Sequence, residues 1–346
     1  MKGTTLKINI TKKFDINIHN PTFLYVGRTI AGIPPHSFWN ARGLSGHNRD
    51  NEKSDRLHDA SFASVQTPDG EGALRAFLDE TVKVFDLMTH ADPAPLKQLI
   101  NQRQFVFVTG IMRSGGTYLL AELSKIHDIP YTTLDMAMLH DRIPKYEYYY
   151  YHEKPIAGMN LFFELAQLLA WVNREMPGRQ TVVKKHQTLS FGLPAMDHVF
   201  GESATYITTL RHPLTAAFSM AHLDSIDLAS PVLPSFYTEW KEMLVPMAGS
   251  EEAFDRLPFY EKFLLYYEKL YVSFARYKET IRGKIIPVAF GREYETFLKN
   301  YAENMGKEYQ PETFNASLKK PVPEALEKAE QTLDRVRAYW TAAGLE

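Results

Sequence analysis

The segment 105–120, FVFVTGIMRSGGTYLL, joins an apolar run to a glycine-bearing turn and then to a second apolar pattern. A strand that leads through such a turn into a helix presents backbone N–H groups that can bind an anion. The spacing from Gly110 to Thr117 fits the phosphate-binding pattern GxxxxGK[ST], but Gly116 stands in the place of the lysine. Without that lysine the loop is poorly equipped for nucleoside triphosphate chemistry. The turn therefore predicts a site for a phosphate of a different nucleotide, with Arg113 as a nearby cation.

A second candidate phosphate site lies in the segment 205–220, TYITTLRHPLTAAFSM. Arg211 follows an apolar, strand-like run, Pro213 suits the first turn of a helix, and Ser219 lies eight residues beyond the arginine. Arginine gives strong, charge-assisted hydrogen bonds to phosphate. The two side chains could hold one phosphate if the strand end lies beside the helix. Taken alone, a surface arginine and a helix serine are the more common interpretation.

A third polar cluster ends the strand-like segment TVVKKHQTLSF, residues 181–191. Side chains alternate along a strand, so Lys184 and His186 share one face and Lys185 points the other way. A histidine is suited to general-base catalysis near neutral pH, and a neighbouring lysine can stabilise negative charge on a leaving group. For any single one of the twelve histidines, a polar loop position is the more common explanation.

Together the three segments resemble the sulfotransferases that use 3′-phosphoadenosine 5′-phosphosulfate (PAPS). The turn MRSGGTYLL is similar to the family's PKSGTTWL and matches it at Ser114, Gly115, Thr117 and Leu119. Arg113 takes the place of the family's lysine, and Tyr118 that of its tryptophan. The family's arginine, proline and serine signature fits Arg211, Pro213 and Ser219, and its KTH stretch is similar to Lys184-Lys185-His186. The resemblance covers residues 104–225, with the three motifs in the family's order.

The resemblance implies a donor site and a catalytic base. The donor would contact Arg113, Ser114, Gly115, Gly116, Thr117 and Tyr118, and its 3′-phosphate would bind Arg211 and Ser219. His186 would be the general base, with Arg113 and Lys184 stabilising charge on the departing adenosine 3′,5′-bisphosphate. No metal ion is expected. Some related enzymes use a glutamate base, which leaves His140, His152 and Glu153 as alternatives.

Two parts of the site have weaker sequence signals. The family's C-terminal arginine-lysine-glycine element has no clear equivalent, and the candidates are Lys319 with Lys320 or Arg282 with Lys284. The acceptor is expected to be a small hydroxylated molecule, apolar or aromatic, held by residues 131–175 and the N-terminal hundred residues. The run KYEYYYYHEK and the side chains of Met159, Leu161, Phe162 and Phe163 suggest its wall, although ordinary core packing explains them equally well.

The elements that must position these clusters alternate along the chain. Strands are predicted at 105–109, 181–184, 204–210 and 285–290, with helices at 118–126, 161–172, 214–223 and 322–340. Such alternation predicts an α/β fold in which helices cover both faces of a central parallel sheet. The resemblance implies that this fold is P-loop-like and nucleotide-binding. Ligands then bind at the carboxyl ends of the strands, where all three clusters fall.

The first hundred residues are expected to form an accessory or cap segment, and 101–346 the sulfotransferase-like domain. Residues 5–18 suggest a hairpin, 41–57 a polar loop, and 71–88 an amphipathic helix.

Composition narrows the classes of function. The chain has 346 residues, 45% hydrophobic and 23% charged, with a net charge of −2 and no cysteine. This argues against nucleic-acid binding and excludes disulfides, a thiolate nucleophile and a cysteine zinc site. No signal peptide or membrane span is evident, so a cytoplasmic protein is expected. The alternatives to a sulfotransferase are a P-loop-type small-molecule kinase and a non-catalytic nucleotide-binding protein; the oligomeric state is left open.

Overall fold

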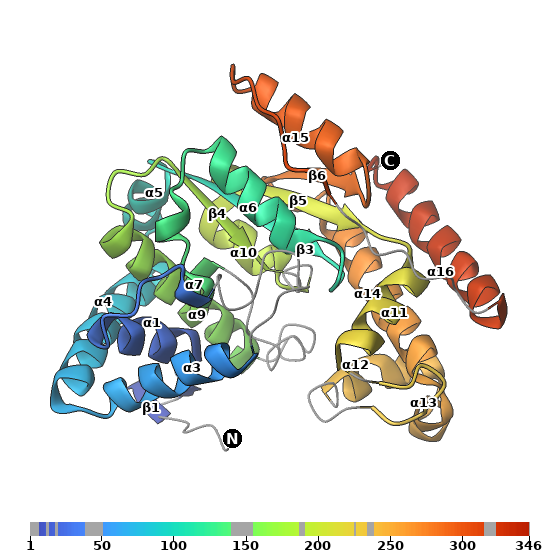
Figure 1. Cartoon of the computed structure of the whole chain (residues 1–346), viewed down its shortest axis with the longest axis horizontal. Coiled ribbons are helices and arrows are strands. Elements are labelled where there is room, and N and C mark those ends of the chain that lie inside the picture. The colour runs from blue at the N-terminus through green and yellow to red at the C-terminus, as the bar shows by residue number, and fades with distance from the viewer. Residues whose placement is uncertain are drawn as a thin grey trace.

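A four-stranded parallel sheet lies at the centre of an α/β fold, with helices packed around it (Figure 1). The structure is a computed structural model and describes residues 7–11, 14–17, 20–38, 51–139, 155–186, 191–224, 226–233, 239–314 and 323–345. The strand order is β4-β3-β5-β6. The strands are β3 (Gln104–Gly110), β4 (Thr181–Lys185), β5 (Ala204–Leu210) and β6 (Lys284–Ala289). The expected α/β class and central parallel sheet are confirmed.

The two central strands are buried almost throughout. In β3, QFVFVTG, every residue after Gln104 is buried, and in β5, ATYITTL, only two residues are partly exposed. Valine, isoleucine, phenylalanine, tyrosine and threonine favour extended backbone, and a strand covered on both faces needs such residues at successive positions. The continuous apolar run that predicted these strands is thus explained by burial on both sides.

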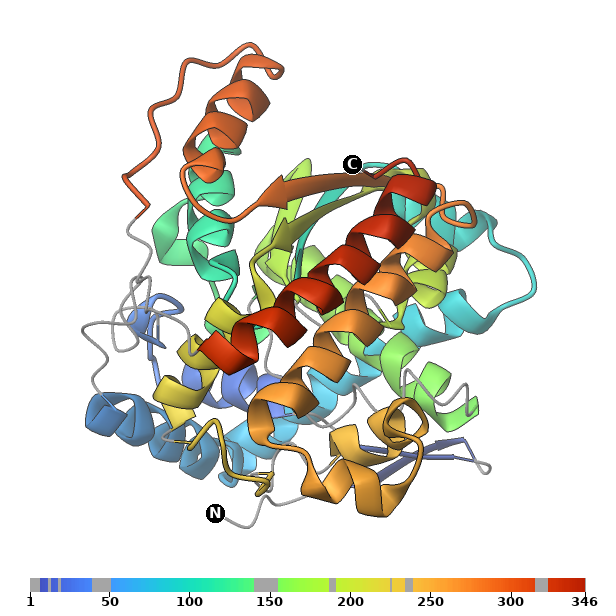
Figure 2. The same cartoon turned by 90° about the vertical axis from the view of Figure 1, so that its right-hand side faces the viewer.

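The direction of the crossovers reverses after β4. The chain moves from β3 outward to β4 and then returns past β3 to β5 and on to β6. Because parallel crossovers are right-handed, this reversal puts helix α6 (Gly116–Ile126) on one face, and α10 (Leu193–Phe200) and α14 (Phe259–Tyr277) on the other. The contacts of α6 with α15 (Glu293–Glu303), and of α10 with α14, agree with this arrangement (Figure 2). The carboxyl ends of β3 and β5 therefore flank the switch point, where ligands bind in such folds.

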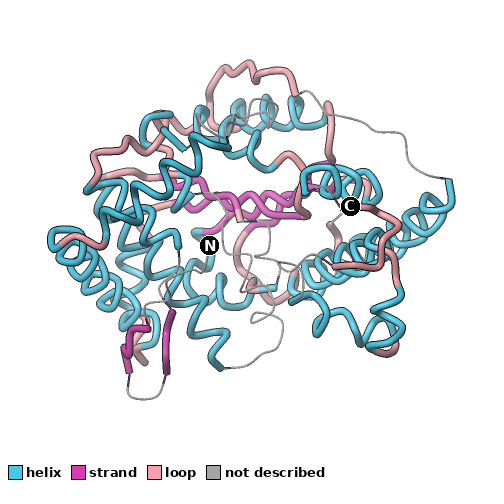
Figure 3. The backbone as a smooth tube through the Cα atoms, turned by 60° about the horizontal axis from the view of Figure 1, so that its bottom comes forward, coloured by secondary structure: helices cyan, strands magenta, loops and turns pink. Residues whose placement is uncertain are grey.

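The N-terminal segment is mostly helical. A hairpin of β1 (Lys7–Thr11) and β2 (Phe14–Asn17) forms a separate two-stranded sheet (Figure 3). It is followed by α1 (Asn20–Ile30), α3 (Asn51–Val65), α4 (Pro68–Thr89) and α5 (Ala94–Ile100). The predicted hairpin and the helix predicted at 71–88 are confirmed.

The expected loop at 41–57 is wrong for residues 51–57, which form the start of α3, while 41–50 lie outside the described residues. The polar side chains that suggested a loop are largely exposed here, and Arg56 donates to Glu52 one turn earlier. Further along, α3 packs on α1 so closely that a Cβ at Gly27 would lie 1.9 Å from the Ser61 carbonyl oxygen. Tertiary packing thus favours a helix that the polar composition concealed.

The remaining helices pack around these elements. They are α7 (Met136–Leu139), α9 (Pro155–Glu175), α11 (Pro213–Asp224), α12 (Glu239–Ala248), α13 (Glu251–Arg256) and α16 (Pro323–Ala342), with short 3₁₀ turns at Tyr131–Thr133 and Gly201–Ser203. Phe77 of α4, Phe105 of β3 and Phe163 of α9 belong to one continuous core. Within the described ranges, no helix has both the length and the hydrophobicity needed to cross a membrane.

Candidate functional site

The turn after β3 folds tightly against β5. Gly110, Arg113 and Gly115 all have positive φ angles, of 115°, 66° and 76°. A Cβ at Gly110 would lie 2.3 Å from the Thr209 Oγ1 of β5, and one at Gly115 would lie 2.8 Å from the Tyr294 ring. Glycine is required at both positions because any side chain would combine strained backbone with a clash. The turn ends at Gly115, and the first turn of α6 leaves N–H groups without partners inside the helix.

Hydrogen bonds hold this turn against β5, α14 and α15. The Ser114 hydroxyl is buried, donates to the Ile111 carbonyl and hydrogen-bonds the Thr209 hydroxyl. Tyr271 of α14 accepts from the Ile111 amide at 3.0 Å and donates to the Thr209 carbonyl. Tyr294 of α15 donates to the Ser114 carbonyl. These contacts give the Ser114 side chain a structural role within the turn.

Arg211 reaches from the end of β5 onto the turn. The buried guanidinium donates through Nη1 to the Arg113 carbonyl and through Nε to Thr215 Oγ1 at 3.1 Å. Its central carbon lies 4.3 Å from the centre of the Phe290 ring, close enough for a cation–π interaction. Burial and the neighbouring positive charge of Arg113 lower the pKa of Arg211 to about 10. The group is therefore still a cation at neutral pH.

Arg113 connects the turn to α11. Its side chain is exposed, and Nε donates to Ser219 Oγ at 3.1 Å. Arg211 and Ser219, the pair predicted from sequence, thus meet through Arg113, whose carbonyl binds one and whose side chain binds the other. Two arginines and a serine from three separate elements converge at the carboxyl ends of β3 and β5.

The two lysines of β4 point to different partners. Lys184 is buried, and its Nζ donates to the Met138 carbonyl of α7 at 2.7 Å. The Lys185 side chain lies on the opposite face, where a Cβ at Gly116 would be 3.0 Å from its Cε. Lys185 therefore packs beside the residue that replaces the lysine of the P-loop pattern. Lys185 thus contacts the first residue of α6, directly after the turn.

His186 continues the sheet by one residue beyond β4, since its amide donates to the Val108 carbonyl at 2.9 Å. The side chain is buried, and Nε2 lies 3.2 Å from Glu164 Oε1 of α9. Thr117 and Tyr118 are half-buried in the first turn of α6. The predicted base and the residues predicted to bind PAPS all lie within the described part of the chain. The alternative bases His140, His152 and Glu153 lie outside the described residues.

An aromatic cluster closes the side of the turn next to α6. The rings of Tyr118 and Phe314 are 4.8 Å apart, and Phe314 also packs against Tyr294 at 5.0 Å and Phe290 at 5.2 Å. A Cβ at Gly115 would lie 3.0 Å from the Phe314 ring. The cluster therefore forms one wall beside the amides of the turn.

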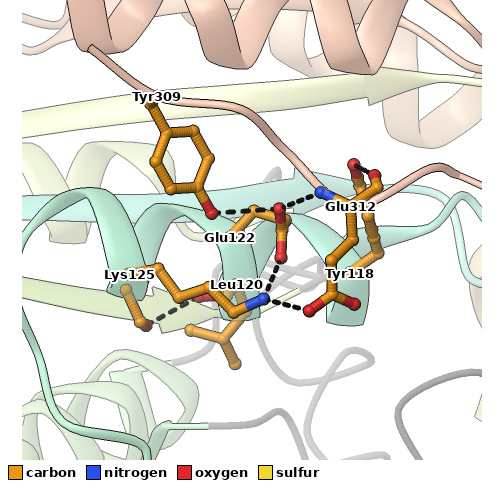
Figure 4. Close-up of polar contacts among 7 residues, drawn as sticks. Tyr118, Leu120, Glu122, Lys125, Tyr309 and Glu312 are labelled. Atoms are coloured by element: carbon orange, nitrogen blue, oxygen red, sulfur yellow. Dashed lines mark hydrogen bonds and ion pairs between the residues drawn. The ribbon is translucent and has the colours of Figure 1, made fainter. Parts of the chain in front are cut away.

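The segment 307–314, which we call the strap, is tied across α6 by a polar network (Figure 4). Glu122, with its side chain 2% exposed, accepts from Tyr309 Oη at 3.0 Å and from the Glu312 amide at 2.9 Å. Lys125 donates to Glu122 and Glu312 at 2.6 Å each. Tyr118 donates to the Glu312 carbonyl, and burial with nearby carboxylates raises the pKa of this phenol and keeps it protonated. The strap carries Phe314 to the turn.

The remaining predicted residues have other surroundings. Arg282 binds Asp197 and Lys284 opens β6, so both lie at the amino ends of the strands, opposite the turn. Lys319, Lys320 and the tyrosine run 148–151 lie outside the described residues. Leu161 and Phe163 are buried in the core, as the packing interpretation expects.

Sequence reasoning missed Phe290, Tyr294, Phe314, Thr209 and Glu164. Two of them carried a usable signal. Phe290 directly follows β6, and the carboxyl ends of parallel strands meet at one edge. Glu164 is a carboxylate within a mostly apolar helix, and such a buried charge signals a polar partner.

No metal-binding group of three or more His, Asp or Glu residues is found among the described residues. Comparisons of the chain with family models, curated proteins and solved structures find no match.

Proposed function

We propose that this protein is a sulfotransferase that moves a sulfuryl group from PAPS to a hydroxyl of a small acceptor. The observation that carries the proposal is the hydrogen bond from Arg211 to the Arg113 carbonyl within the turn. It supports one binding site in which the amides of the turn and the guanidinium of Arg211 contact the same nucleotide. The two predicted phosphate sites, about a hundred residues apart in the chain, are then parts of one pocket.

The charges of the site suit a donor that has two separate anionic groups. Arg113 and Arg211 lie close enough that the positive charge of Arg113 contributes to the lowered pKa of Arg211. Bound phosphates relieve this repulsion between the two cations and accept their hydrogen bonds. Helix α6 adds the partial positive charge of its N-terminus at the turn. Adenosine 3′,5′-bisphosphate, the product expected from PAPS, has a phosphate for each end of the site.

In this proposal the residues of the site have separate roles in an in-line transfer of the sulfuryl group. His186 accepts the proton of the acceptor hydroxyl while its oxygen forms a bond to sulfur. The bond between sulfur and the bridging oxygen breaks, and Arg113 stabilises the negative charge that stays on the departing phosphate. The sequence motif assigns a second stabilising charge to Lys184, and the contact of Lys185 with Gly116 makes Lys185 a competing candidate. Positioning and charge stabilisation supply most of the rate in such transfers.

Binding and transfer can be tested separately. Adenosine 3′,5′-bisphosphate without magnesium should raise the melting temperature of the wild-type protein, because a ligand at 100 times its Kd adds about 2.7 kcal/mol of stability. Arg211→Ala should abolish most of this rise. His186→Ala should keep it but lose sulfuryl transfer to a panel of alcohols and phenols, by about 10²–10⁴-fold. No stabilisation of the wild type by the bisphosphate, or wild-type turnover by His186→Ala, would contradict the proposal.

A second candidate function is phosphoryl transfer from ATP. It is favoured by the packing of Lys185 beside Gly116, since a lysine from a neighbouring strand could replace the missing lysine of the P-loop pattern. ATP with magnesium would then stabilise the protein more strongly than the bisphosphate does. The same melting experiment therefore separates the two transferases, and the transfer assay separates both from a non-catalytic nucleotide-binding protein.

A further inference from the structure

Helix α9 buries a carboxylate inside an otherwise apolar environment. Its neighbours Leu161, Phe163 and Leu165 are part of the core, yet the Glu164 side chain between them is only 8% exposed. Burying a carboxylate is costly unless it is hydrogen-bonded or paired. Glu164 Oε1 lies 3.2 Å from Nε2 of His186, whose side chain is 1% exposed. The contact joins two buried titratable groups from elements 22 residues apart in the sequence.

The backbone of His186 is fixed independently of this contact. Its amide donates to the Val108 carbonyl in β3, the strand that leads into the turn. The peptide is thus held by the sheet, while the imidazole is held by α9. With the main chain held by the sheet and Nε2 held by α9, the ring has a defined orientation at the carboxyl end of β4.

We propose that Glu164 is a positioning residue for His186 in the proposed sulfuryl transfer, on which this inference rests. An ionised carboxylate can only accept a hydrogen bond, so the shared hydrogen belongs to the imidazole Nε2. In the proposed tautomer the imidazole carries its one hydrogen on Nε2, and Nδ1 takes the proton of the acceptor hydroxyl. Glu164 also stabilises the imidazolium that forms, in the way the carboxylate of a serine protease triad does.

The tautomer of His186 can be measured without any substrate. Two-bond ¹H–¹⁵N correlation spectra of the full-length protein with labelled histidine distinguish the two neutral forms, and the His186→Ala variant identifies the signal. The wild type should carry the proton on Nε2. In Glu164→Gln, the amide can donate to Nε2 and drive the proton to Nδ1, whereas Glu164→Asp keeps an acceptor and should keep the wild-type tautomer.

Kinetics then test the role in catalysis. Glu164→Gln should lower kcat for sulfuryl transfer by about 10²–10⁴-fold, the contribution of a general base, with unchanged affinity for adenosine 3′,5′-bisphosphate. Glu164→Asp should recover part of the rate. Gln167→Leu is the matched control, because Gln167 lies one turn further on α9 and accepts from Thr22 instead. It should lose stability yet keep both the tautomer and kcat.

The outcomes separate this inference from the proposed function. A proton on Nδ1 in the wild type, or a wild-type tautomer and kcat in Glu164→Gln, would overturn the role of Glu164 even if sulfuryl transfer is observed. If the His186 proton moves to Nδ1 in Glu164→Gln, Glu164 controls the tautomer of His186, as proposed. Absence of bisphosphate binding by the wild type would instead contradict the proposed function, whatever the tautomer.

Discussion

The sequence motif and the structure point to different lysines near the turn after β3. The motif points to Lys184, but that amine donates to the Met138 carbonyl, and the stem of Lys185 packs on Gly116. Adjacent residues of a strand point to opposite faces, so Lys185 points toward α6 while Lys184 shares a face with His186. Which lysine stabilises the leaving group therefore depends on the face of the strand on which that group lies.

A pair of lysine variants can decide this assignment. Lys185→Met should weaken binding of adenosine 3′,5′-bisphosphate by about 10-fold or more, because a hydrogen bond to a charged group contributes about 1.5–3 kcal/mol. Lys184→Met should lower stability through loss of its buried hydrogen bond while binding stays close to wild type. Isothermal titration with both variants measures the effect. Weaker binding in Lys184→Met alone would favour the motif's assignment.

The strap shows how an element without regular structure is fixed by one helix. Glu122 of α6 accepts hydrogen bonds from Tyr309 and from the Glu312 backbone while pairing with Lys125 (Figure 4). Because the carboxylate is buried, its loss would leave several donors without an acceptor. The strap in turn holds Phe314 against Gly115, which links this network to the wall of the candidate site.

Glu122→Gln should therefore destabilise the protein by about 1–3 kcal/mol, the cost of leaving buried polar groups unsatisfied. Glu308→Gln is the matched control on the strap, since Glu308 is exposed and its change should stay within about 0.5 kcal/mol. Urea unfolding followed by circular dichroism measures both variants. Equal midpoints for Glu122→Gln and wild type would show that the network does not hold the strap.

Across the whole molecule, a buried ion pair joins helix α1 of the N-terminal segment to the residue before α7. Arg28 of α1 donates to Asp135, just before α7, and the two side chains are 6% and 1% exposed. The same short helix, α7, provides the carbonyl that Lys184 binds. The N-terminal segment is thus connected through α7 to the strand that carries His186.

Removing one partner of this pair leaves a buried charge uncompensated. Asp135→Asn should lower the free energy of unfolding by about 3–5 kcal/mol, whereas Arg28→Met combined with Asp135→Leu should lose much less. Glu52→Gln, which breaks the exposed pair with Arg56, should change stability by less than about 1 kcal/mol. Denaturant unfolding tests all three. A small loss in Asp135→Asn would mean that the pair does not secure the N-terminal helices.

The sequence by itself determined the local units: the strands at 105–109, 181–184 and 204–210, the turn and helix that follow the first, and the class of the sheet. These depend on short-range periodicity and on glycine at positions such as Gly110, where positive φ and contact with Thr209 exclude a side chain. The helix at 259–277 was missed, although its buried tyrosines and phenylalanines carry a clear helical period.

Only the tertiary structure decided which of these units meet. Arg211 reaches Arg113 because β5 returns to lie beside β3, and His186 pairs with Glu164 because α9, from an earlier part of the chain, lies beside the end of β4. Phe290 and Phe314 reach the turn from still more distant segments. A local pattern fixes the direction of a side chain relative to its own element, whereas its partner is chosen by close packing between elements.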